Sequence, residues 1–556
     1  MTFNLIQESW LPVRRRSGIV EHIPPWRITD RIAEDPVIGF AWPRPDFNGA
    51  AHELLIGLLS TATAPASEDA WADWWNHPPT PQFLKQRFST ISAAFELDGT
   101  RARFMQDSDT LENAQHKEVA LLLVDAPGAQ TLQNNADLFV KRGAAPALAR
   151  ATAAMALFTL NTYAPSGGAG HRTSLRGGGP LTSLIIAEHR EYGATLWGRT
   201  WPNVESLEQI AERAVNGIGS DDLFRTFPWM VPARTSGKAG GRDTTPADVH
   251  PLQVYWGMPR RIRLHFEEAT DQRCGLTGMY DTIMVNQFRT KNYGTNYSEG
   301  FQHPLTPYYR QNSRKTSKLP EHPNPGGFSY RLWPRVVVSS NDRLREPAQT
   351  VRHWKHDRHA RAAQKATSRL AAFGYDMDNM KARAWMEGEM PLYQFGEETR
   401  VWLEIFIRRA TAGAHSAARL LTGAVKSALY DRPKDASGDF GFVSERFFRD
   451  TEKDFYSALE DANRHIQNLP DAEDPAIAAL QKWARVLALA AEQLFDELAD
   501  PGGMEHRDMR RHVSARHYLA LALGGRGKAG KSLFEKDLGI PLPTHSRSRT
   551  KTKRTQ

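Results

Sequence analysis

The chain has 556 residues, of which 40% are hydrophobic and 24% charged, and its formal net charge is +8. This length exceeds one ordinary hydrophobic core, so two or three domains are expected, and the composition is that of a folded globular protein. The apolar runs are too short to span a bilayer, and the first residues do not resemble a secretory signal. We therefore expect a cytoplasmic protein with no membrane partner, whose modest basic excess favours a polyanionic partner.

The single cysteine, Cys274, excludes disulfide frameworks and cysteine-rich zinc or iron–sulfur sites. A lone cysteine could act as a nucleophile, but a structural thiol is favoured. His353, His356 and His359 have helical spacing, yet cations separate them and Asp357 is the only carboxylate nearby. Because no catalytic motif appears either, we expect no metal, no cofactor and no enzymatic activity.

The N-terminal part reads as mixed α and β structure. Residues 10–13 and 19–23 flank Ser17-Gly18, which predicts a β-hairpin, and an apolar helix is expected over 50–63. From about 100 to 400, short strand-like segments such as 261–266 and 335–338 alternate with helices and with long loops rich in glycine and proline. This pattern favours an α+β domain.

After about residue 395 the pattern changes to long helices, expected over 401–429, 443–466, 474–500 and 507–523. In the third, Asp474 can cap the N-terminus and Pro475 suits the first turn. Apolar residues recur in it at alternating intervals of three and four: Ile477, Leu480, Ala484, Leu487, Ala491, Leu494 and Leu498. We therefore predict a large mixed α/β domain over 1–395, a C-terminal four-helix bundle over 396–535, and a flexible basic tail over 536–556.

The segment from Gly525 to Ser532 matches G-x-x-x-x-G-K-S, the P-loop that binds phosphates in NTPases. A working P-loop follows a buried strand and opens a helix of a parallel sheet. Here the preceding residues continue a helical pattern, and only 24 residues follow Ser532. A glycine helix cap leading into a flexible basic linker is therefore favoured over an NTPase that uses Lys531.

Basic and aromatic residues alternate between Phe288 and Lys318, a stretch that holds one acid, Glu299. Cations bind phosphates while exposed aromatic rings stack on bases, so this stretch predicts a nucleic-acid surface, although several of the rings could belong to the core. Further basic faces are expected on 260–265 and on a helix carrying Arg352, Lys355, Arg358 and Arg361.

A glycine cluster at 167–170 is followed by His171, Arg172 and Arg176. Glycines beside cations let a backbone approach a groove closely, because no Cβ intervenes. Taken alone, a plain surface loop is the better interpretation.

Together, several segments resemble the large subunit of the type I-E CRISPR surveillance complex, Cascade. They are Asn4-Leu5-Ile6, Trp10 to Arg14, Phe104-Met105-Gln106, residues 153–158, the glycine segment 164–179 and the C-terminal helices. The resemblance implies a non-catalytic subunit that recognises the protospacer-adjacent motif (PAM) in double-stranded DNA through the minor groove. It also implies the start of duplex opening and recruitment of a helicase-nuclease, with guide RNA and the other Cascade subunits as partners. An RNA-binding scaffold without duplex recognition is the remaining alternative.

The resemblance also implies site residues. The lysine that enters the minor groove matches Lys291, with Arg289 two residues away, and the glycine loop at the same groove matches Gly168-Ala169-Gly170. An alanine stands there where the family has its central glycine.

Two further positions follow from the same resemblance. The wedge glutamine at the tip of a hairpin falls near Asn379, whose side chain is shorter. The loop that docks near the 5′ end of the guide RNA matches Phe139-Val140-Lys141, and Lys141 departs from the family's asparagine.

Overall fold

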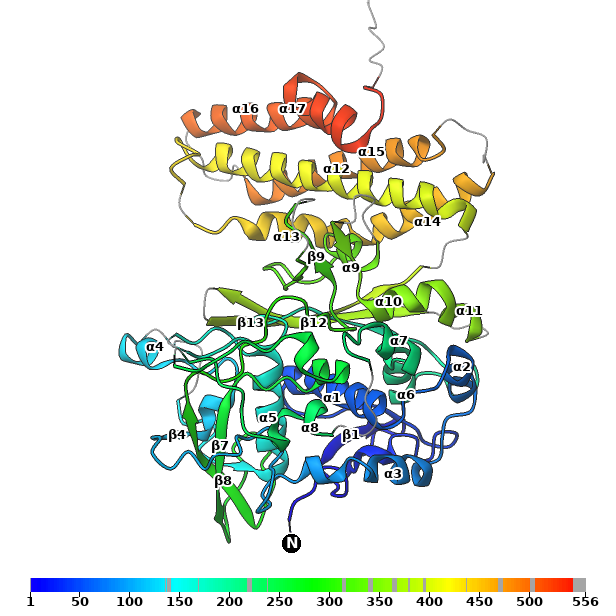
Figure 1. Ribbon diagram of the computed structural model, residues 1–556. Coiled ribbons are helices and arrows are strands. Elements are labelled where there is room, and N and C mark those ends of the chain that lie inside the picture. The colour runs from blue at the N-terminus through cyan, green and yellow to red at the C-terminus, as the bar shows by residue number, and fades with distance from the viewer. Residues whose placement is uncertain are drawn as a thin grey trace, which may run out of the picture. The chain divides into compact units, whose positions relative to one another are not determined.

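The computed structural model describes residues 2–135, 137, 142–168, 170–217, 223–237, 239–312, 317–338, 344–362, 368–378, 381–393, 397–436, 438–468, 474–500 and 506–543. The chain divides into two compact units (Figure 1). The first unit comprises residues 1–324 and 335–392, and the second comprises residues 325–334 and 393–556. Each unit is described here by itself.

The first unit contains most of the strands and many short helices. Its strands are β1 (Leu11–Arg15), β2 (Val20–Ile23), β3 (Val37–Phe40), β4 (His116–Glu118), β5 (Leu148–Ala149), β6 (Thr182–Ile186), β7 (Arg261–Glu268), β8 (Ile283–Lys291), β9 (Tyr308–Tyr309), β10 (Leu319–Pro320), β11 (Arg345–Glu346), β12 (Arg369–Asp378) and β13 (Lys381–Pro391). Its helices are α1 (Pro45–Ala62), α2 (Glu68–Asn76), α3 (Pro81–Ser89), α4 (Ala129–Gln133), α5 (Arg150–Tyr163), α6 (Leu196–Thr200), α7 (Leu207–Glu212), α8 (Leu223–Thr226), α10 (Gln349–His353) and α11 (His359–Arg361).

Two helices form the centre of this unit's core. Helices α1 and α5 pack on each other and are buried along most of their length. The apolar helix expected over 50–63 is therefore confirmed, and it begins earlier, at Pro45. The hairpin expected near the N-terminus is confirmed as well, since β1 and β2 pair in antiparallel register with Leu11 opposite Ile23.

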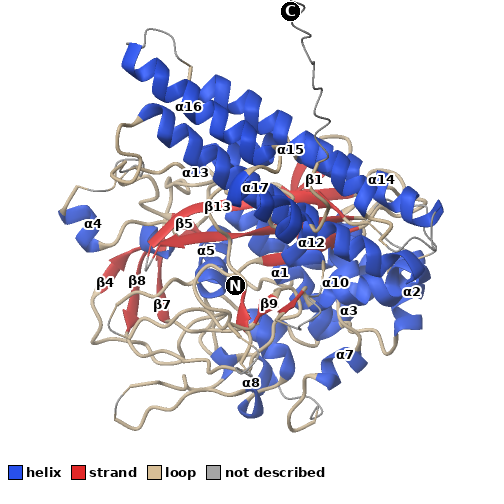
Figure 2. Cartoon of the chain, turned by 90° about the horizontal axis from the view of Figure 1, so that it is seen from above, coloured by secondary structure: helices blue, strands red, loops and turns tan. Residues whose placement is uncertain are grey.

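Two of the sheets lie next to the site residues that the sequence analysis singled out. In one, β8 lies between β4 and β7, and Arg261 of β7 stands opposite Lys291 of β8 (Figure 2). In the other, β12 pairs with β6 on one side and forms a long antiparallel hairpin with β13 on the other, with Phe373 opposite Glu387.

The second unit is helical and consists of α12 (Glu397–Leu429), α13 (Gly441–Asp450), α14 (Glu452–Asn468), α15 (Ile477–Leu498), α16 (His506–Leu523) and α17 (Gly527–Lys531). Helix α12 packs against α13 to α16. The predicted fold class, a mixed α/β region followed by a helical bundle, is confirmed.

The apolar seam of α15 is largely as predicted. Leu480, Leu487 and Leu494 are buried, whereas Ile477 and Leu498 at its ends are only partly covered. Trp483, outside the predicted seam, is also buried, and its Nε1 donates to the carbonyl of Ala410 at 2.9 Å.

Three local predictions are wrong. The helix expected over 443–466 breaks at Thr451, whose hydroxyl lies 2.8 Å from that of the buried Tyr330. Residues 335–338, expected as a strand, belong mostly to helix α9 (Trp333–Val337). Asp474 is not the cap of α15, because Ala476 holds that position and Asp474 accepts its N–H.

The P-loop-like segment is helical. It follows α16 directly rather than a strand, with Gly525 at φ +80°, and continues as α17 and a π-helix, Ser532–Leu538. The expected flexible linker is therefore wrong, and so is a tail that starts at 536, since the π-helix extends to Leu538 and packs on α12. The local setting that phosphate binding by a P-loop requires is not formed.

No described helix is both long and apolar enough to cross a membrane. Within the same residues, no three His, Cys, Asp or Glu side chains gather in a way that could hold a metal ion. Cys274 is buried, with its sulfur 3.4 Å from the hydroxyl oxygen of Thr152.

The α15 seam can be tested with a pair of leucines on one helix. Leu487 is 1% exposed, so Leu487→Ala should lower the free energy of unfolding by about 2 to 5 kcal/mol. Leu489, which is 61% exposed, provides the control, because Leu489→Ala should change the free energy of unfolding by less than about 0.5 kcal/mol. Urea denaturation followed by circular dichroism measures both, and equal effects would refute the seam.

Candidate nucleic-acid interface

The glycine loop is a tight turn that only residues without a side chain adopt easily. Gly168 and Gly170 both have φ of +79°. The N–H of Gly167 donates to the carbonyl of His171, and the N–H of His171 donates back to that of Gly168. These two hydrogen bonds close the turn between Gly167 and His171.

This loop meets the chain just beyond Lys291. The N–H of Tyr293 donates to the carbonyl of Gly170 at 2.8 Å, and a Cβ on Gly170 would lie 2.9 Å from the Tyr293 ring. The structure thus brings together the glycine loop and the end of β8, as the resemblance implied, although they are more than 120 residues apart.

Tyr293 has an unusual backbone conformation. Its φ is +60°, a region that non-glycine residues seldom occupy. Hydrogen bonds on both sides hold it there, because its carbonyl accepts from the N–H of Ser236 while its N–H bonds Gly170. The ring is 39% exposed, so a strained backbone presents an aromatic side chain beside the loop.

The cations on β7 and β8 face two carboxylates that the sequence analysis did not single out. Arg261 donates to Asp107 at 2.6 Å, and Nζ of Lys291 lies 3.5 Å from Oδ2 of Asp109. The pKa of Asp109 is lowered chiefly by the hydrogen bond that its side chain accepts from the N–H of Leu111. The positive charges of Lys291 and Arg261 lower it further. The Lys291 contact is long and exposed, so little free energy opposes its exchange for another acceptor.

Arg289 and the other cations of this region are held differently. Arg289 donates to Nε2 of His116 at 3.0 Å, and Arg172 donates to Ser236. Arg260 is buried and donates to the carbonyl of Pro165, and burial lowers its pKa to about 10. Of these four cations, Lys291 makes the longest polar contact.

Arg176, expected beside the glycines as a surface cation, instead lies inside the protein. It forms an ion pair with Glu53 of α1 at 2.6 Å and also donates to the hydroxyls of Thr182 and Thr306. Both charged side chains are 3% exposed. This pair anchors the chain that follows the glycine loop to α1.

The aromatic residues between Phe288 and Lys318 are partly buried in the core and partly exposed on the surface. Phe288, Phe301 and Tyr308 are buried, whereas Tyr293 is exposed. Ala169, Asn379 and the segment Phe139-Val140-Lys141 lie outside the described residues, as do Arg314 and Lys315. Asn379 falls in the sequence between β12, which ends at Asp378, and β13, which starts at Lys381.

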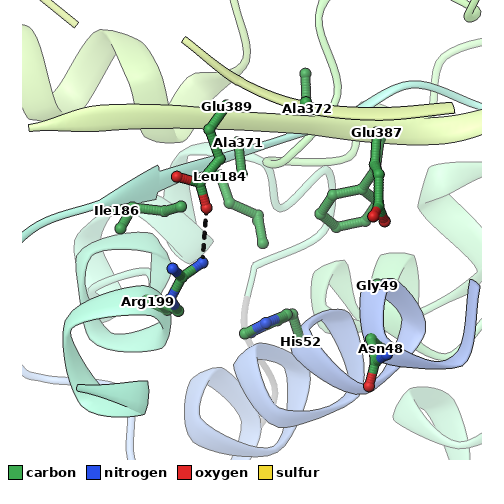
Figure 3. Close-up of a pocket in the computed structure, with 12 residues that line it drawn as sticks. Asn48, Gly49, His52, Leu184, Ile186, Arg199, Ala371, Ala372, Glu387 and Glu389 are labelled. Atoms are coloured by element: carbon green, nitrogen blue, oxygen red, sulfur yellow. Dashed lines mark hydrogen bonds and ion pairs between the residues drawn. The ribbon is translucent and has the colours of Figure 1, made fainter. Parts of the chain in front are cut away.

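A cavity of about 330 Å³ lies elsewhere in the same unit, against the β12–β13 hairpin. His52 of α1, Arg199 of α6 and Glu387 and Glu389 of β13 line it, and Figure 3 shows the dashed contact between Arg199 and Glu389, 3.0 Å long. The sequence analysis did not identify it, since its residues come from five separate elements, α1, β6, α6, β12 and β13.

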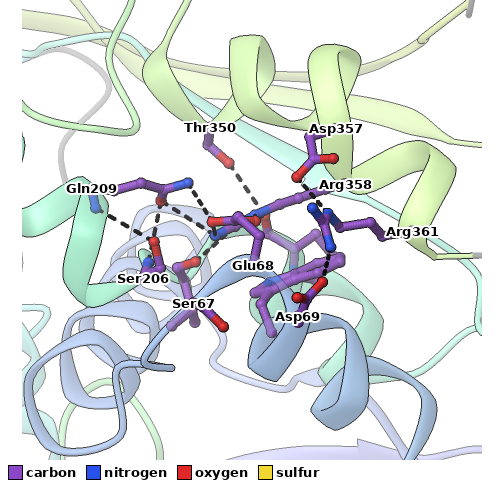
Figure 4. A network of polar contacts seen from close by, with 12 residues as sticks. Ser67, Glu68, Asp69, Ser206, Gln209, Thr350, Asp357, Arg358 and Arg361 are labelled. Carbon is purple, nitrogen blue, oxygen red and sulfur yellow. Dashed lines mark hydrogen bonds and ion pairs between the residues drawn. The ribbon is translucent and has the colours of Figure 1, made fainter.

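The basic helix expected at 352–361 is not one exposed face. Its middle is a π-helix (Trp354–Arg358), and the buried Arg358 forms two hydrogen bonds to Glu68 and one to Gln209 (Figure 4). Arg361 is partly exposed and pairs with Asp357 and with the exposed Asp69. The network connects α2 to the segment before β12, which is a structural role.

A family model described as CRISPR-associated protein Cse1 matches residues 4–494. The chain belongs to the Cse1 family. The family inferred from sequence resemblance is therefore confirmed.

Solved structures agree with this assignment. Thermobifida fusca Cse1 is 17% identical, with a TM-score of 0.67 over 94% of this chain and 97% of that one. Thermus thermophilus CasA is 19% identical, with a TM-score of 0.61, and the match covers 93% of this chain and 99% of that one. A chain of a CRISPR RNA-guided surveillance complex is 17% identical, with a TM-score of 0.65 over 93% and 99%. At these identities the matches show a shared fold.

The buried Arg176–Glu53 pair can be tested directly. Arg176→Met leaves the Glu53 carboxylate buried without its main partner, so it should cost about 3 to 5 kcal/mol of unfolding free energy. Combining it with Glu53→Gln removes the unpaired charge and should restore part of the loss. Thermal and urea denaturation of both variants measure this, and a double variant no more stable than the single would contradict it.

Proposed function

We propose that this Cse1-family chain is the large subunit of a type I-E CRISPR RNA-guided surveillance complex and recognises the PAM of double-stranded DNA through the minor groove. Lys291 and the loop from Gly168 to Gly170 read the groove. The observation that carries the proposal is the hydrogen bond from Tyr293 to Gly170, which puts the glycine loop beside the end of the strand bearing Lys291.

The chemistry of the minor groove fits these groups. Each base pair presents acceptors there, N3 of purines and O2 of pyrimidines, and a lysine ammonium is a donor only. A glycine backbone can approach the groove floor because no Cβ blocks it. Since this groove hardly distinguishes A·T from T·A, such a reader accepts several PAM sequences.

The remaining roles follow from family membership. We propose that the β12–β13 hairpin, with Asn379 between its strands, acts as a wedge that starts duplex opening. Phe139-Val140-Lys141 docks near the 5′ end of the guide RNA. Other Cascade subunits and a helicase-nuclease effector complete the set of partners, and the protein itself is not an enzyme.

Lys291→Ala tests PAM recognition. Loss of a contact to base acceptors should weaken binding of PAM-bearing targets by the assembled complex by roughly 5- to 150-fold, and targets without a PAM by much less. Lys85→Ala, which removes an exposed lysine from α3 of the same unit, should change neither class. If Lys291→Ala weakens both classes equally, Lys291 is only a phosphate contact, and the minor-groove reader must be sought at Arg289 or in the loop from Gly167 to Arg176.

The NTPase alternative has its own test. Because Gly525 to Ser532 continues a helix rather than following a strand, purified protein should not hydrolyse ATP. A phosphate-release assay with wild type and Lys531→Ala decides this. ATP turnover that Lys531→Ala abolishes would establish the alternative.

A further inference from the structure

The cavity against the β12–β13 hairpin adjoins a second, more open hollow of about 630 Å³. Arg199 lines both, so the two spaces meet at its guanidinium. The hollow is also lined by Arg16, Arg190 and Tyr192. All of these residues belong to the first unit.

The open hollow has the properties of a phosphate site. Three arginines line it against one carboxylate, that of Glu191. Within the described part of the chain, Arg190 has no hydrogen-bond or ion-pair partner, so its five N–H donors are available. Guanidinium groups pair with phosphate oxygens in a bidentate manner, which makes several converging arginines a strong phosphate receptor.

The hollow is also rigid. Arg16 donates to the carbonyls of Tyr192 and Ala194, while Nδ1 of His189 accepts the N–H groups of Glu191 and Tyr192. The Tyr192 ring stacks on His189 at 4.5 Å between centroids, and His189 in turn contacts Trp75. Such preorganisation lowers the entropy lost when a ligand binds.

The first cavity is lined by two carboxylates and one guanidinium, those of Glu387, Glu389 and Arg199. Glu387 and Glu389 extend from β13 toward α1 and α6, and Ala371 of β12 and Leu184 of β6 provide apolar walls (Figure 3). Glu389 is paired with Arg199 at 3.0 Å and with Arg369 at 3.2 Å, so its charge is largely balanced. Glu387 accepts the indole N–H of Trp385 at 2.8 Å, and its other oxygen can accept a hydrogen bond from an amino group. A cavity of 330 Å³ is large enough for a nucleoside.

The His52 side chain forms part of the wall of this cavity. Its Nδ1 is shielded from solvent and has no hydrogen-bond partner among the described residues. Burial, with a smaller contribution from Arg199, lowers the pKa of His52 to about 3, so the ring is neutral at physiological pH. The ring therefore adds no charge to the wall of the cavity.

We propose that these two spaces form one nucleotide-binding site, with an amino-bearing base in the cavity beside Glu387 and His52 and the phosphate in the hollow on Arg16, Arg190 and Arg199. Charge favours this orientation, since Glu387 disfavours phosphate beside it whereas the arginines attract phosphate to the open hollow. The site is separate from the residues that read the PAM and does not depend on that proposal.

Isothermal titration of the purified full-length chain with AMP, GMP and UMP tests the site. AMP and GMP should bind, and UMP, which has no amino group, should bind about tenfold more weakly. Absence of AMP and GMP binding, or equal binding of UMP, would overturn the assignment.

Variants locate the bound nucleotide. Arg190→Ala removes a charge-assisted hydrogen bond and should weaken AMP about tenfold or more. Arg101→Ala, an exposed arginine of the same unit outside both spaces, should leave AMP binding unchanged. Ala371→Leu should block the cavity and abolish binding. If Ala371→Leu lowers the melting temperature, its loss of binding is not informative. The comparison of Arg190→Ala with Arg101→Ala then tests the site, because both residues are exposed and their replacement should not affect folding. Equal affinities of these two variants for AMP would refute the site.

The source of the nucleotide is settled by comparing AMP with a tetradeoxyadenylate. Tighter binding of the oligonucleotide, lost in Arg190→Ala, assigns the site to a single strand. Preference for AMP assigns it to a free nucleotide. Failure of both to bind refutes the proposal.

Discussion

The carboxylate of Glu53 is the group around which the first unit is organised. A buried charge is costly unless it is paired and hydrogen-bonded. The Glu53 carboxylate accepts hydrogen bonds from Arg176 at 2.6 Å, from the hydroxyl of Thr182 at 2.7 Å and from the hydroxyl of Tyr163. These partners come from the segment after the glycine loop, the start of β6 and the end of α5. One charge on α1 therefore fixes three segments against the core.

The position of the glycine loop depends on these contacts to Glu53. The loop lies in the chain between Tyr163 and Arg176, both of which contact Glu53, so the segments on either side of it are fixed. Tyr293 completes the arrangement, because its left-handed backbone is held between Gly170 and Ser236. Strain of this kind persists only where the surroundings enforce it, and it is concentrated at functional sites.

The hairpin is fixed to the same helix. The Tyr375 hydroxyl donates to Asp46 at 2.6 Å, and Trp385 packs so closely on Gly49 that a Cβ there would lie 2.6 Å from its ring. Farther along the strands this contact opens into the cavity, which both strands line. A ligand there would touch α1 and the hairpin together, which links the nucleotide site to the element we propose as the wedge.

The sequence by itself determined the elements with a strong local signal: the first hairpin from its Ser-Gly turn, α1 from its apolar run, the seam of α15 from its period, and the family from the order of its motifs. It also placed Gly168 and Lys291 in one site, but through resemblance rather than through their spacing.

Only the tertiary structure decided which cations face outward. Arg176 and Arg358 resemble surface arginines in the sequence. Each is nevertheless buried against a glutamate from a distant segment, Glu53 and Glu68 respectively. Local pattern specifies local hydrogen bonding and an apolar face, whereas the burial of a charge depends on whether a partner arrives from elsewhere in the chain, and that is a property of the assembled fold.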